Sequence, residues 1–397
     1  MEKPNRYLLK HISIYTPYNI ISDGCIAIED GYIAKVDAEP CSSGEAYSID
    51  LSGYIVGPGF IDTHIHGILG FDVMDAKPSS FLSMSKALTR YGVTSFIPTT
   101  VTASHETIIE ICKSLVVAYE QWTPLSGARI LGIHLEGPYI NSIRAGAQNK
   151  QFIRKPDIDE FNEYYNACKG LVREITVAPE INGAIDFITI LSKKNITIQI
   201  GHTNATYREA VKGILAGASK ATHLYNSMRE IHHREPGVAI ALLSNPAIYL
   251  ELIADLIHIS REMLMFTINC AGVDRVVLIT DAISATGMPD GLYELGGLKI
   301  KVEKGIPKLV DSDSFAGSTL TMDKAFRNII SLGYSIKEAF IMASTNPAKS
   351  INAIEKEKIG LIKPGWKADM VILNDDLEVA MTIVNGNILF NKTDLQL

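Results

Sequence analysis

The sequence contains few cysteines, and none has the spacing of a metal-binding pair. The five cysteines are Cys25, Cys41, Cys112, Cys168 and Cys270. Cysteine zinc sites use closely spaced pairs such as Cys-x-x-Cys, and disulfide frameworks belong to short secreted chains that are rich in cysteine. We therefore expect reduced thiols, with neither a cysteine zinc site nor a disulfide framework.

The chain also lacks a long apolar run and an excess of positive charge. It has no stretch of about 18 uncharged apolar residues, and its polar start, Met-Glu-Lys-Pro-Asn-Arg, has no signal-peptide pattern. The formal net charge is -7 at pH 7, so no overall basic field attracts nucleic acid or an anionic membrane. We expect a cytoplasmic protein that binds neither, in which any anion site is local.

The central part of the chain alternates short apolar runs with amphipathic stretches. This pattern predicts repeated βα units around a parallel sheet. The predicted strands are residues 60–66, 94–98, 130–136, 174–178, 197–201, 220–222, 249–254 and 275–280. Helices are predicted between them at residues 79–91, 105–121, 182–193 and 207–216. Eight strands favour an α/β fold of the (β/α)8 TIM-barrel type, which takes about 250 residues.

The two ends of the chain have a different pattern, typical of short antiparallel strands. Residues 7–14 and 24–36 alternate apolar and polar, and residues 369–373, 380–384 and 388–390 are strand-like around an Asn385-Gly386-Asn387 turn. Neither end has enough apolar surface to be stable alone. We therefore predict a small β-sandwich domain from residues 1–56 and 358–397, and a barrel domain from residues 57–357. The Gly- and Pro-rich stretch 287–314 is expected to leave the barrel after its eighth strand.

Side chains that can bind a metal ion stand at the ends of the predicted barrel strands. His64 and His66 are two residues apart on one strand and therefore point to the same face. Later strands end in Glu136, His202, His223 and Asp281. The C-terminal ends of barrel strands surround one active site, so these side chains are expected to converge. Imidazole and carboxylate groups suit zinc or another divalent first-row ion such as iron.

The histidines and Glu136 also have an interpretation without a metal ion. His64 and His66 would then be ordinary half-buried histidines of a strand. Glu136 would then be a buried carboxylate paired with a cation. His202 and His223 would be hydrogen-bonded core histidines. His134, on the same strand face as Glu136, is either a support for the site or a packed core residue.

Several segments together resemble those of the N-acetylglucosamine-6-phosphate deacetylases, a family of the amidohydrolase superfamily. They are Gly-Phe-Ile-Asp-Thr-His-Ile-His-Gly, His-Leu-Glu-Gly-Pro-Tyr-Ile-Asn, Gly-His-Thr-Asn-Ala, Thr-His-Leu-Tyr-Asn-Ser-Met, Arg-Glu-Pro-Gly and Thr-Asp-Ala. The similarity runs from about residue 57 to residues 316–322, and the flanking strands match the small domain of the family. The combination is specific, although each segment alone is weak.

The resemblance implies a hydrolytic deacetylation of N-acetyl-D-glucosamine 6-phosphate to D-glucosamine 6-phosphate and acetate, in amino-sugar catabolism and recycling. It implies that Glu136, His202 and His223 bind the principal divalent ion. His64 and His66 are then available for a second one, so we expect one or two ions per subunit, zinc or iron. Asp281 would be the catalytic carboxylate, which takes a proton from the attacking water and returns it to the sugar nitrogen.

The substrate phosphate requires a local cation in this acidic chain. By resemblance, Arg234 and His258 match the phosphate-binding positions of the family, and Asn226 and Ser227 assist from the loop after the sixth strand. A guanidinium group offers a planar fork of donors to a phosphate. The alternatives are an ion pair of Arg234 with Glu235, and a helix-start or interface role for His258. The family is typically dimeric, so we expect a homodimer in which Arg234 serves either its own or the neighbouring subunit.

One position departs from the family pattern. Many members place a histidine in the loop after Glu-Gly-Pro, where it contacts the substrate carbonyl, whereas this chain has Gln148. Gln148 can donate a hydrogen bond to substrate but cannot become cationic.

Three other functions compete with this assignment. N-acetylgalactosamine 6-phosphate is a close alternative substrate. Amidohydrolases that act on cyclic amides often use a carboxylated lysine on the fourth strand, but residues 175–179 contain none. A barrel that has lost catalysis and serves as a scaffold would have a disrupted site, whereas every expected metal position and Asp281 are intact.

Overall fold

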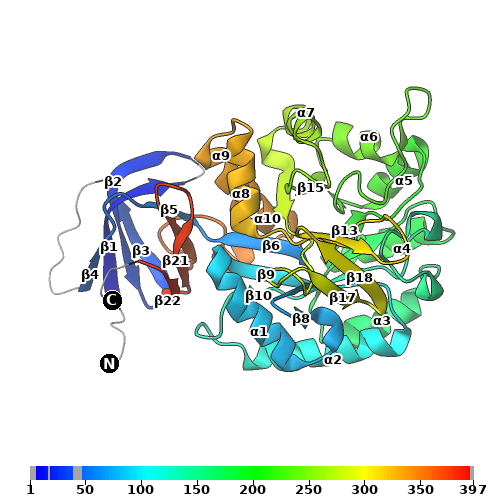
Figure 1. The fold of residues 1–397 in the computed structure, drawn as a ribbon, viewed down its shortest axis with the longest axis horizontal. Helices are drawn as coiled ribbons and strands as arrows, with labels where there is room; N and C mark the ends of the chain where they lie inside the picture. Colours follow the sequence, from blue (N-terminus) through cyan, green and yellow to red (C-terminus); the bar gives the residue numbers. More distant parts are fainter. Residues whose placement is uncertain (1–5, 17, 39–46, 394–397) are drawn as a thin grey trace.

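The structure, a computed structural model, describes residues 6–16, 18–38 and 47–393. Figure 1 shows two parts side by side, a large barrel surrounded by helices and a smaller sheet that contains both the first and the last strand of the chain. The polar start at residues 1–5 and Cys41 lie outside the described residues. The predicted fold class, a TIM barrel with a small β-domain built from both chain ends, is confirmed.

The barrel consists of parallel strands in the order β10-β9-β11-β12-β13-β14-β15-β16, with β6 paired to β9. Its strands are β6 (Phe60–Ile65), β9 (Val93–Thr100), β10 (Arg129–Ile130), β11 (Ile133–Glu136), β12 (Val172–Val177), β13 (Thr197–Ile200), β14 (Lys220–Ala221), β15 (Tyr249–Ile253) and β16 (Val276–Ile279). The first and last strands meet where the Asp281 amide donates to the His64 carbonyl at 2.9 Å. The predicted strand 130–136 is divided in two, because Gly132 interrupts it with a φ of +137°.

The helices lie around the barrel and pack apolar faces on its strands. They are α1 (Pro78–Leu88), α2 (His105–Gln121), α3 (Ile158–Ala167), α4 (Ala184–Leu191), α5 (Tyr207–Ala216), α6 (Gly237–Ser244), α7 (Arg261–Ala271), α8 (Met322–Ser331), α9 (Ile336–Phe340) and α10 (Asn346–Ser350). The predicted bounds of α2 and α5 are confirmed. Both begin after a capping side chain, Ser104 for α2 and Thr206 for α5, which accepts a hydrogen bond from the first-turn backbone.

The smaller part is one sheet with strands from both chain ends. Its order is β22-β21-β20-β5-β1-β2-β3, with β4 paired to β1. Its strands are β1 (Arg6–Tyr15), β2 (Ile20–Glu29), β3 (Tyr32–Asp37), β4 (Tyr47–Asp50), β5 (Ile55–Pro58), β20 (Met370–Leu373), β21 (Val379–Val384) and β22 (Asn387–Asn391). The two ends join where β20 pairs with β5. Antiparallel pairing is confirmed for β1, β2 and β3, whereas β4 and β5 lie parallel to β1.

The domain boundaries themselves stay a prediction. The division between residues 56 and 57 falls inside β5. The small sheet nevertheless has a hydrophobic cluster of its own, which includes Leu9, Ile26 and Met370, separate from the cluster inside the barrel.

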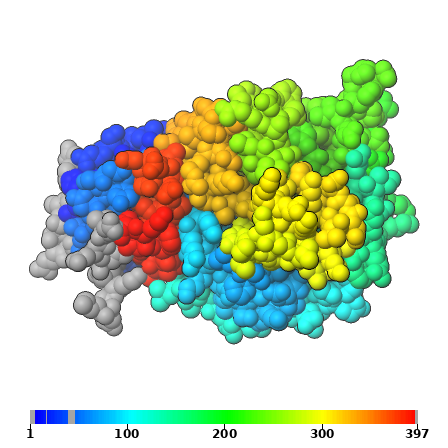
Figure 2. Space-filling model, viewed as in Figure 1, coloured from blue at the N-terminus to red at the C-terminus, as the bar shows by residue number. Residues whose placement is uncertain are grey.

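The predicted excursion after the eighth strand is a three-stranded antiparallel flap of β17 (Gly291–Leu295), β18 (Leu298–Glu303) and β19 (Ile306–Leu309). In the space-filling view it is the yellow region on the visible face of the barrel (Figure 2). A short hairpin, β7 (Gly67–Ile68) and β8 (Phe71–Asp72), follows β6 at the same end. The flap packs Leu295 and Ile300 against Val101, so its apolar face is held on the barrel rim.

The cysteine prediction is partly wrong. Cys112, Cys168 and Cys270 are free thiols, as expected. The first two are buried and the third is exposed. Cys25, by contrast, is disulfide-bonded. A disulfide requires only that two sulfur atoms meet in the fold, and sequence spacing does not reveal such a meeting. Within the described ranges, no helix is long and apolar enough to cross a lipid bilayer.

Candidate active site

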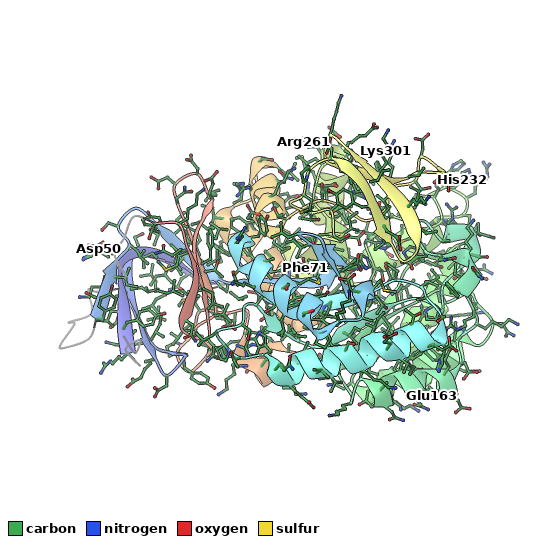
Figure 3. All side chains as sticks on the ribbon, turned by 60° about the horizontal axis from the view of Figure 1, so that its bottom comes forward. Asp50, Phe71, Glu163, His232, Arg261 and Lys301 are labelled. Carbon is green, nitrogen blue, oxygen red and sulfur yellow. The ribbon has the colours of Figure 1, made fainter. Side chains whose placement is uncertain are left out.

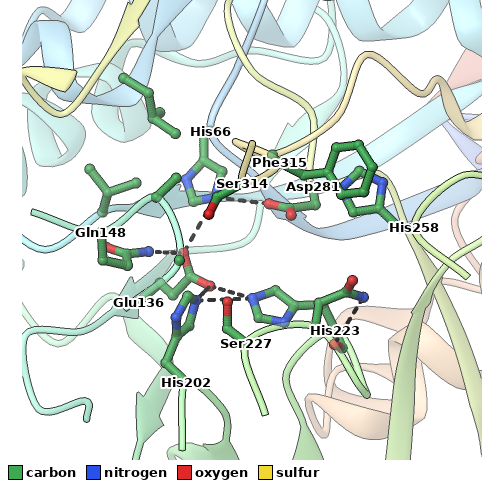
Figure 4. Close-up of a pocket in the computed structure, with 16 residues that line it drawn as sticks. His66, Glu136, Gln148, His202, His223, Ser227, His258, Asp281, Ser314 and Phe315 are labelled. Carbon is green, nitrogen blue, oxygen red and sulfur yellow. Dashed lines mark hydrogen bonds and ion pairs between the residues drawn. The ribbon is translucent and has the colours of Figure 1, made fainter. Parts of the chain in front are cut away.

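The site residues predicted from strand ends meet in one pocket at the C-terminal ends of the barrel strands (Figure 4). The polar lining includes His66, Glu136, His202, His223 and Asp281, together with Gln148, Asn226, Ser227, His258 and Ser314. His64 is fully buried directly behind this lining and contacts Glu136 and Asp281. The strands therefore bring together side chains that are more than two hundred residues apart in sequence.

Four of these residues have an unusual backbone conformation with a positive φ, namely Ser227 at 53° and the three strand-end residues given next. His202, His223 and Asp281 follow β13, β14 and β16 with φ values of 44°, 26° and 51°. This left-handed region is unfavourable for residues with a Cβ atom, at a cost of about 1–3 kcal/mol each. For Asp281 the backbone is held on both sides, because its amide donates to His64 and its carbonyl accepts from the Ser318 amide at 2.7 Å. Strain of this kind is typical of functional sites, where it aims side chains away from the direction of the strand.

Glu136 lies at the centre of the site. Its Oε1 atom is 2.9 Å from His223 Nε2, 3.1 Å from His202 Nε2 and 3.5 Å from His64 Nε2. Its Oε2 atom is 3.4 Å from His66 Nε2. The Oε1 atom therefore faces His202, His223 and His64, and the Oε2 atom faces His66. His64 and His66 together form the second set of imidazoles.

Asp281 lies opposite Glu136 and joins the second set. Its Oδ1 atom is 3.0 Å from His66 Nε2 and 3.5 Å from His64 Nε2. Ligand atoms of His64, Glu136 and His223 lie within 4.8 Å of one another, and so do those of His64, His66 and Asp281. These are two overlapping groups, each able to hold a metal ion.

The chemistry of the donor atoms fits a divalent cation. Nδ1 of His66 and Nδ1 of His202 face backbone carbonyls, at 3.0 Å from Thr99 O and 2.9 Å from Arg144 O. In the neutral rings Nδ1 would therefore carry the proton, which leaves the Nε2 lone pair for a bound cation in place of the contacts that Nε2 makes here.

One distance and one unpartnered atom also favour a bound divalent cation. Nε2 of His202 is 3.2 Å from Nε2 of His223, and tetrahedral zinc with nitrogen ligands at 2.0–2.1 Å separates them by about 3.3 Å. His64 Nε2 is buried and makes no hydrogen bond within the described part of the chain. A buried polar atom without a partner is costly, and a bound cation would satisfy it.

The electrostatics of the site favour anionic carboxylates. Burial raises the pKa of Glu136, but the nearby His64 and His202 hold it well below its usual range. Burial likewise raises the pKa of Asp281, and the hydrogen bond from His66 and the charges of His64 and His66 lower it below its usual value. Burial lowers the pKa of His64, but Glu136 and Glu251 raise it well above its ordinary value. The two carboxylates are thus charged at neutral pH and suited to bind a cation.

Gln148 contacts the centre of the site directly. Its Nε2 atom donates to Glu136 Oε2 at 2.6 Å, and its Oε1 atom accepts from the Thr102 amide at 2.6 Å. The side chain is buried and lines the pocket. Both ends of the amide are therefore fixed, and one of them holds the carboxylate that the histidines surround.

Three of the predicted phosphate-binding residues line the pocket on its other side. Asn226 and Ser227 come from the loop after β14. The side-chain Nδ2 of Asn226 donates to the His223 carbonyl at 3.3 Å. His258 Nδ1 lies 2.7 Å from Asp255 Oδ2, and its ring centroid is 4.8 Å from that of Phe315. The hydrogen bond to Asp255 leaves His258 Nε2 as the nitrogen available to the pocket.

Arg234 is the predicted residue that the structure does not bring to this pocket. It is exposed, its guanidinium donates to His233 Nε2 at 2.9 Å, and it is not part of the pocket lining. Figure 3 shows the neighbouring His232 at the periphery of the barrel. The alternative ion pair with Glu235 is not found among the described residues; Glu235 instead accepts from the Tyr207 and Gly237 amides.

The sequence and the structure match one protein family along almost the whole chain. The model of the amidohydrolase family matches residues 55–389. The chain belongs to the amidohydrolase family. This amidohydrolase is 38% identical to the N-acetylglucosamine-6-phosphate deacetylase of Bacillus subtilis, over 96% of this chain and 97% of that one. It is 35% identical to the N-acetylgalactosamine-6-phosphate deacetylase of Escherichia coli O157:H7, over 96% and 99%.

Solved structures agree with these relatives. A mutant N-acetyl-D-glucosamine-6-phosphate deacetylase from Mycobacterium smegmatis, in complex with N-acetyl-D-glucosamine-6-phosphate, matches with a TM-score of 0.92 and 32% identity, over 98% of this chain and 100% of that one. The N-acetylglucosamine-6-phosphate deacetylase of Thermotoga maritima matches with a TM-score of 0.87 and 35% identity, over 97% and 100%. The resemblance stated from sequence motifs is thereby confirmed.

The sequence interpretation missed a group of charged residues inside this amidohydrolase barrel. Glu174, Lys220 and Glu251 are fully buried beneath the pocket and contact one another. The available signal was a charged residue within a short apolar strand, as in Leu-Glu-Leu-Ile at residues 250–253. His134 lies beside this group, with its ring packed edge-on at 4.8 Å against that of His64 and its Nε2 atom 2.8 Å from Thr176 Oγ1.

Proposed function

We propose that the chain removes the acetyl group from N-acetyl-D-glucosamine 6-phosphate by hydrolysis, giving D-glucosamine 6-phosphate and acetate, in amino-sugar catabolism and recycling in the cytoplasm. The observation that carries this proposal is the convergence of Glu136, His202, His223 and Asp281 on one pocket, in a chain 38% identical to a relative with that name. An amide is hydrolysed by activating water, stabilising the oxyanion and protonating the leaving nitrogen.

Glu136, His202 and His223 would hold the principal divalent ion, and His64 and His66 a second one, with zinc or iron as the expected metal. A bound divalent ion lowers the pKa of water to about 7 and polarises a carbonyl. Glu136 presents one oxygen to each set of imidazoles, so it would join the two positions. Gln148, whose amide is fixed on Glu136 Oε2, keeps that carboxylate in place and lines the pocket.

Asp281 would act as the proton carrier. Its Oδ1 atom is fixed by His66 at 3.0 Å, and its pKa is held below the usual value, so it is ready to accept a proton. It takes the proton of the attacking water and delivers it to the amide nitrogen as the carbon–nitrogen bond breaks. The amine would otherwise leave as a high-energy anion.

Binding of the phosphate is assigned to Asn226, Ser227 and His258 on the far side of the pocket. Arg234 would supply the guanidinium group to the pocket of a neighbouring subunit, since it does not line the pocket of its own chain. The proposal therefore includes a homodimer.

The second candidate substrate is N-acetylgalactosamine 6-phosphate, because a relative at 35% identity carries that name. Cyclic amides are less well supported. Residues 175–179 contain no lysine, and Lys220 is ion-paired with two carboxylates, at 2.9 Å from Glu174 and 2.8 Å from Glu251. An ammonium group that makes such pairs is not available for carboxylation.

Acetate release from acetylated amino sugars, with ring opening of dihydroorotate measured beside it, tests this proposal. The panel of substrates contains both N-acetylhexosamine 6-phosphates, unphosphorylated N-acetylglucosamine and dihydroorotate, each with enzyme stripped by a chelator and then reloaded with zinc or ferrous iron. We expect the glucosamine phosphate to give the highest kcat/KM, and activity to be lost on stripping and regained on reloading. A faster reaction with the galactosamine phosphate, or none with either phosphate, would contradict the substrate assignment.

A further inference from the structure

Glu174 (β12), Lys220 (β14) and Glu251 (β15) form a charged cluster inside the barrel, under the floor of the pocket. All three side chains have zero exposed area. Lys220 Nζ lies 2.9 Å from Glu174 Oε1 and 2.8 Å from Glu251 Oε1, and it donates to Thr63 Oγ1 at 2.9 Å. All three donors of the ammonium group are therefore used.

Fold stability does not explain this cluster. The interior of such a barrel is usually filled by branched aliphatic side chains. Removing a charge from water costs several kcal/mol, and well-packed apolar residues often replace a buried ion pair without loss of stability.

Glu251 connects the cluster to the histidines of the pocket. Its Oε1 atom pairs with Lys220, while its Oε2 atom lies 3.1 Å from His64 Nδ1 and accepts from the His223 amide at 3.3 Å. His64 thereby differs from His66 and His202, whose Nδ1 atoms face neutral backbone carbonyls. A carboxylate on Nδ1 orients the ring, fixes its tautomer and makes the opposite nitrogen a stronger ligand.

The opposite nitrogen of His64 is aimed at the second group of metal-binding side chains. His64 Nε2 lies 3.5 Å from both Glu136 Oε1 and Asp281 Oδ1, and it is one of the buried side-chain atoms that lack a hydrogen-bond partner among the described residues. Glu251 therefore lies directly behind a ligand that points at the place of the second ion.

We propose that Glu251 is the positioning residue of the second metal position: fixed by Lys220, it holds His64 in the tautomer and orientation that bind the ion shared with His66 and Asp281. This inference rests on the metal site of the proposed function. According to this inference, buried residues that do not line the pocket control how strongly the second ion binds.

Metal uptake by the full-length protein tests the inference without reference to activity. Stripped wild type, Glu251→Gln and Glu174→Gln are dialysed against buffered free Co²⁺, the cobalt per subunit is counted by mass spectrometry, and the cobalt absorption spectrum is recorded. Glu174→Gln is the matched control, since Glu174 is equally buried and also pairs with Lys220. Its ion-pair and hydrogen-bond partners among the described residues are Lys220 and Gln199 rather than a pocket histidine.

We expect wild type and Glu174→Gln to take up both ions with similar affinity. In Glu251→Gln the second ion should bind about 10–100-fold more weakly while the first is retained, with loss of the corresponding absorption band. Glu251→Asp keeps the charge beside Lys220 but shortens the reach to His64, so it should show the same selective loss and replaces Glu251→Gln if that variant does not fold.

The outcomes are distinguishable. Equal uptake of the second ion by wild type and the Glu251 variants would overturn the inference and leave the proposed function intact. An equal loss in Glu174→Gln would also overturn it, because the cluster would then act only through the fold. Wild type that takes up no cobalt would contradict the metal site itself, and the inference with it.

Discussion

Gln148 stands where the family resemblance leads us to expect a histidine, and its contacts define what it contributes. It bridges the Thr102 amide and Glu136 Oε2 through two hydrogen bonds. Gln148→Ala would leave Glu136 without one of its partners, and hydrogen bonds to charged groups are worth about 1.5–3 kcal/mol. We expect kcat/KM for N-acetylglucosamine 6-phosphate to fall about tenfold to a hundredfold. Gln151→Ala, an exposed change in the same loop, is the control, and wild-type kinetics in Gln148→Ala would rule out this role.

Gly146 also shapes the pocket, because it has no side chain. Its φ is +56°, and a Cβ atom would lie 2.5 Å from Ser227 Oγ. Gly146→Ala should therefore displace Ser227 and raise KM for the phosphorylated substrate, on top of a backbone cost of about 1–2 kcal/mol. Gly53→Ala separates the two effects, because Gly53 has a φ of +82° with nothing within 4 Å of a Cβ atom. An unchanged KM in Gly146→Ala would show that Ser227 does not contact substrate.

At the scale of residues, the sequence predicted the candidate metal-binding side chains but not the buried residues that fix their orientation. His64, Glu136, His202, His223 and Asp281 were accessible because the ends of parallel barrel strands meet at one rim. The contact between Glu251 and His64 joins residues that are 187 positions apart in sequence. No local pattern encodes such a pairing, which arises only when the strands close into a barrel.

At the scale of elements, the flap β17–β19 is the part that most directly encloses the pocket. Leu295 on β17 is buried, lines the pocket and packs with Val101, whereas Leu292 on the same strand is 75% exposed. Truncating a buried leucine to alanine typically costs 2–5 kcal/mol, so we expect Leu295→Ala to lower the free energy of unfolding by about 2–3 kcal/mol. The measurement is denaturant unfolding, with KM recorded beside it.

Leu292→Ala is the matched control for this change and should alter stability by less than about 0.5 kcal/mol. Equal stability of the two variants would mean that the flap is not anchored through its apolar face.

Elements were predictable where local signals are strong. The helices α2 and α5 were predicted to the residue because a capping side chain and an amphipathic run define each. The break between β10 and β11 was missed, since Gly132 stands inside an otherwise continuous apolar run. The flap was predicted only as an excursion, because its packing against Val101 depends on the tertiary structure.

At the scale of the whole molecule, the position of Arg234 outside its own pocket predicts an active site shared between subunits. Arg234→Ala and Asp281→Asn should each be nearly inactive alone. In mixed dimers the Arg234→Ala subunit would keep Asp281 and receive Arg234 from its neighbour. Co-expression of the two variants should therefore restore about a quarter of wild-type activity, from one working site in half of the dimers. No restoration, or a fully active monomer, would show that Arg234 does not act across an interface.

The joining of the two chain ends into one sheet was predicted from their strand patterns and from their lack of apolar surface. The pairing of β20 with β5, which makes the connection, lies between segments more than three hundred residues apart and has no local signal. The order of the strands in that sheet, and the parallel pairing of β1 with β4 and β5, came from the structure alone.

The central claim is that Asp281 carries the proton in a metal-dependent deacetylation of a phosphorylated amino sugar. It is tested most directly by acetate release from N-acetylglucosamine 6-phosphate with metal-replete wild type and Asp281→Asn, with unphosphorylated N-acetylglucosamine as control substrate. We expect Asp281→Asn to reduce kcat by about a hundredfold or more, and wild type to prefer the phosphorylated sugar strongly. Equal rates for the two proteins would contradict the role of Asp281, and equal rates with the two sugars would contradict the substrate.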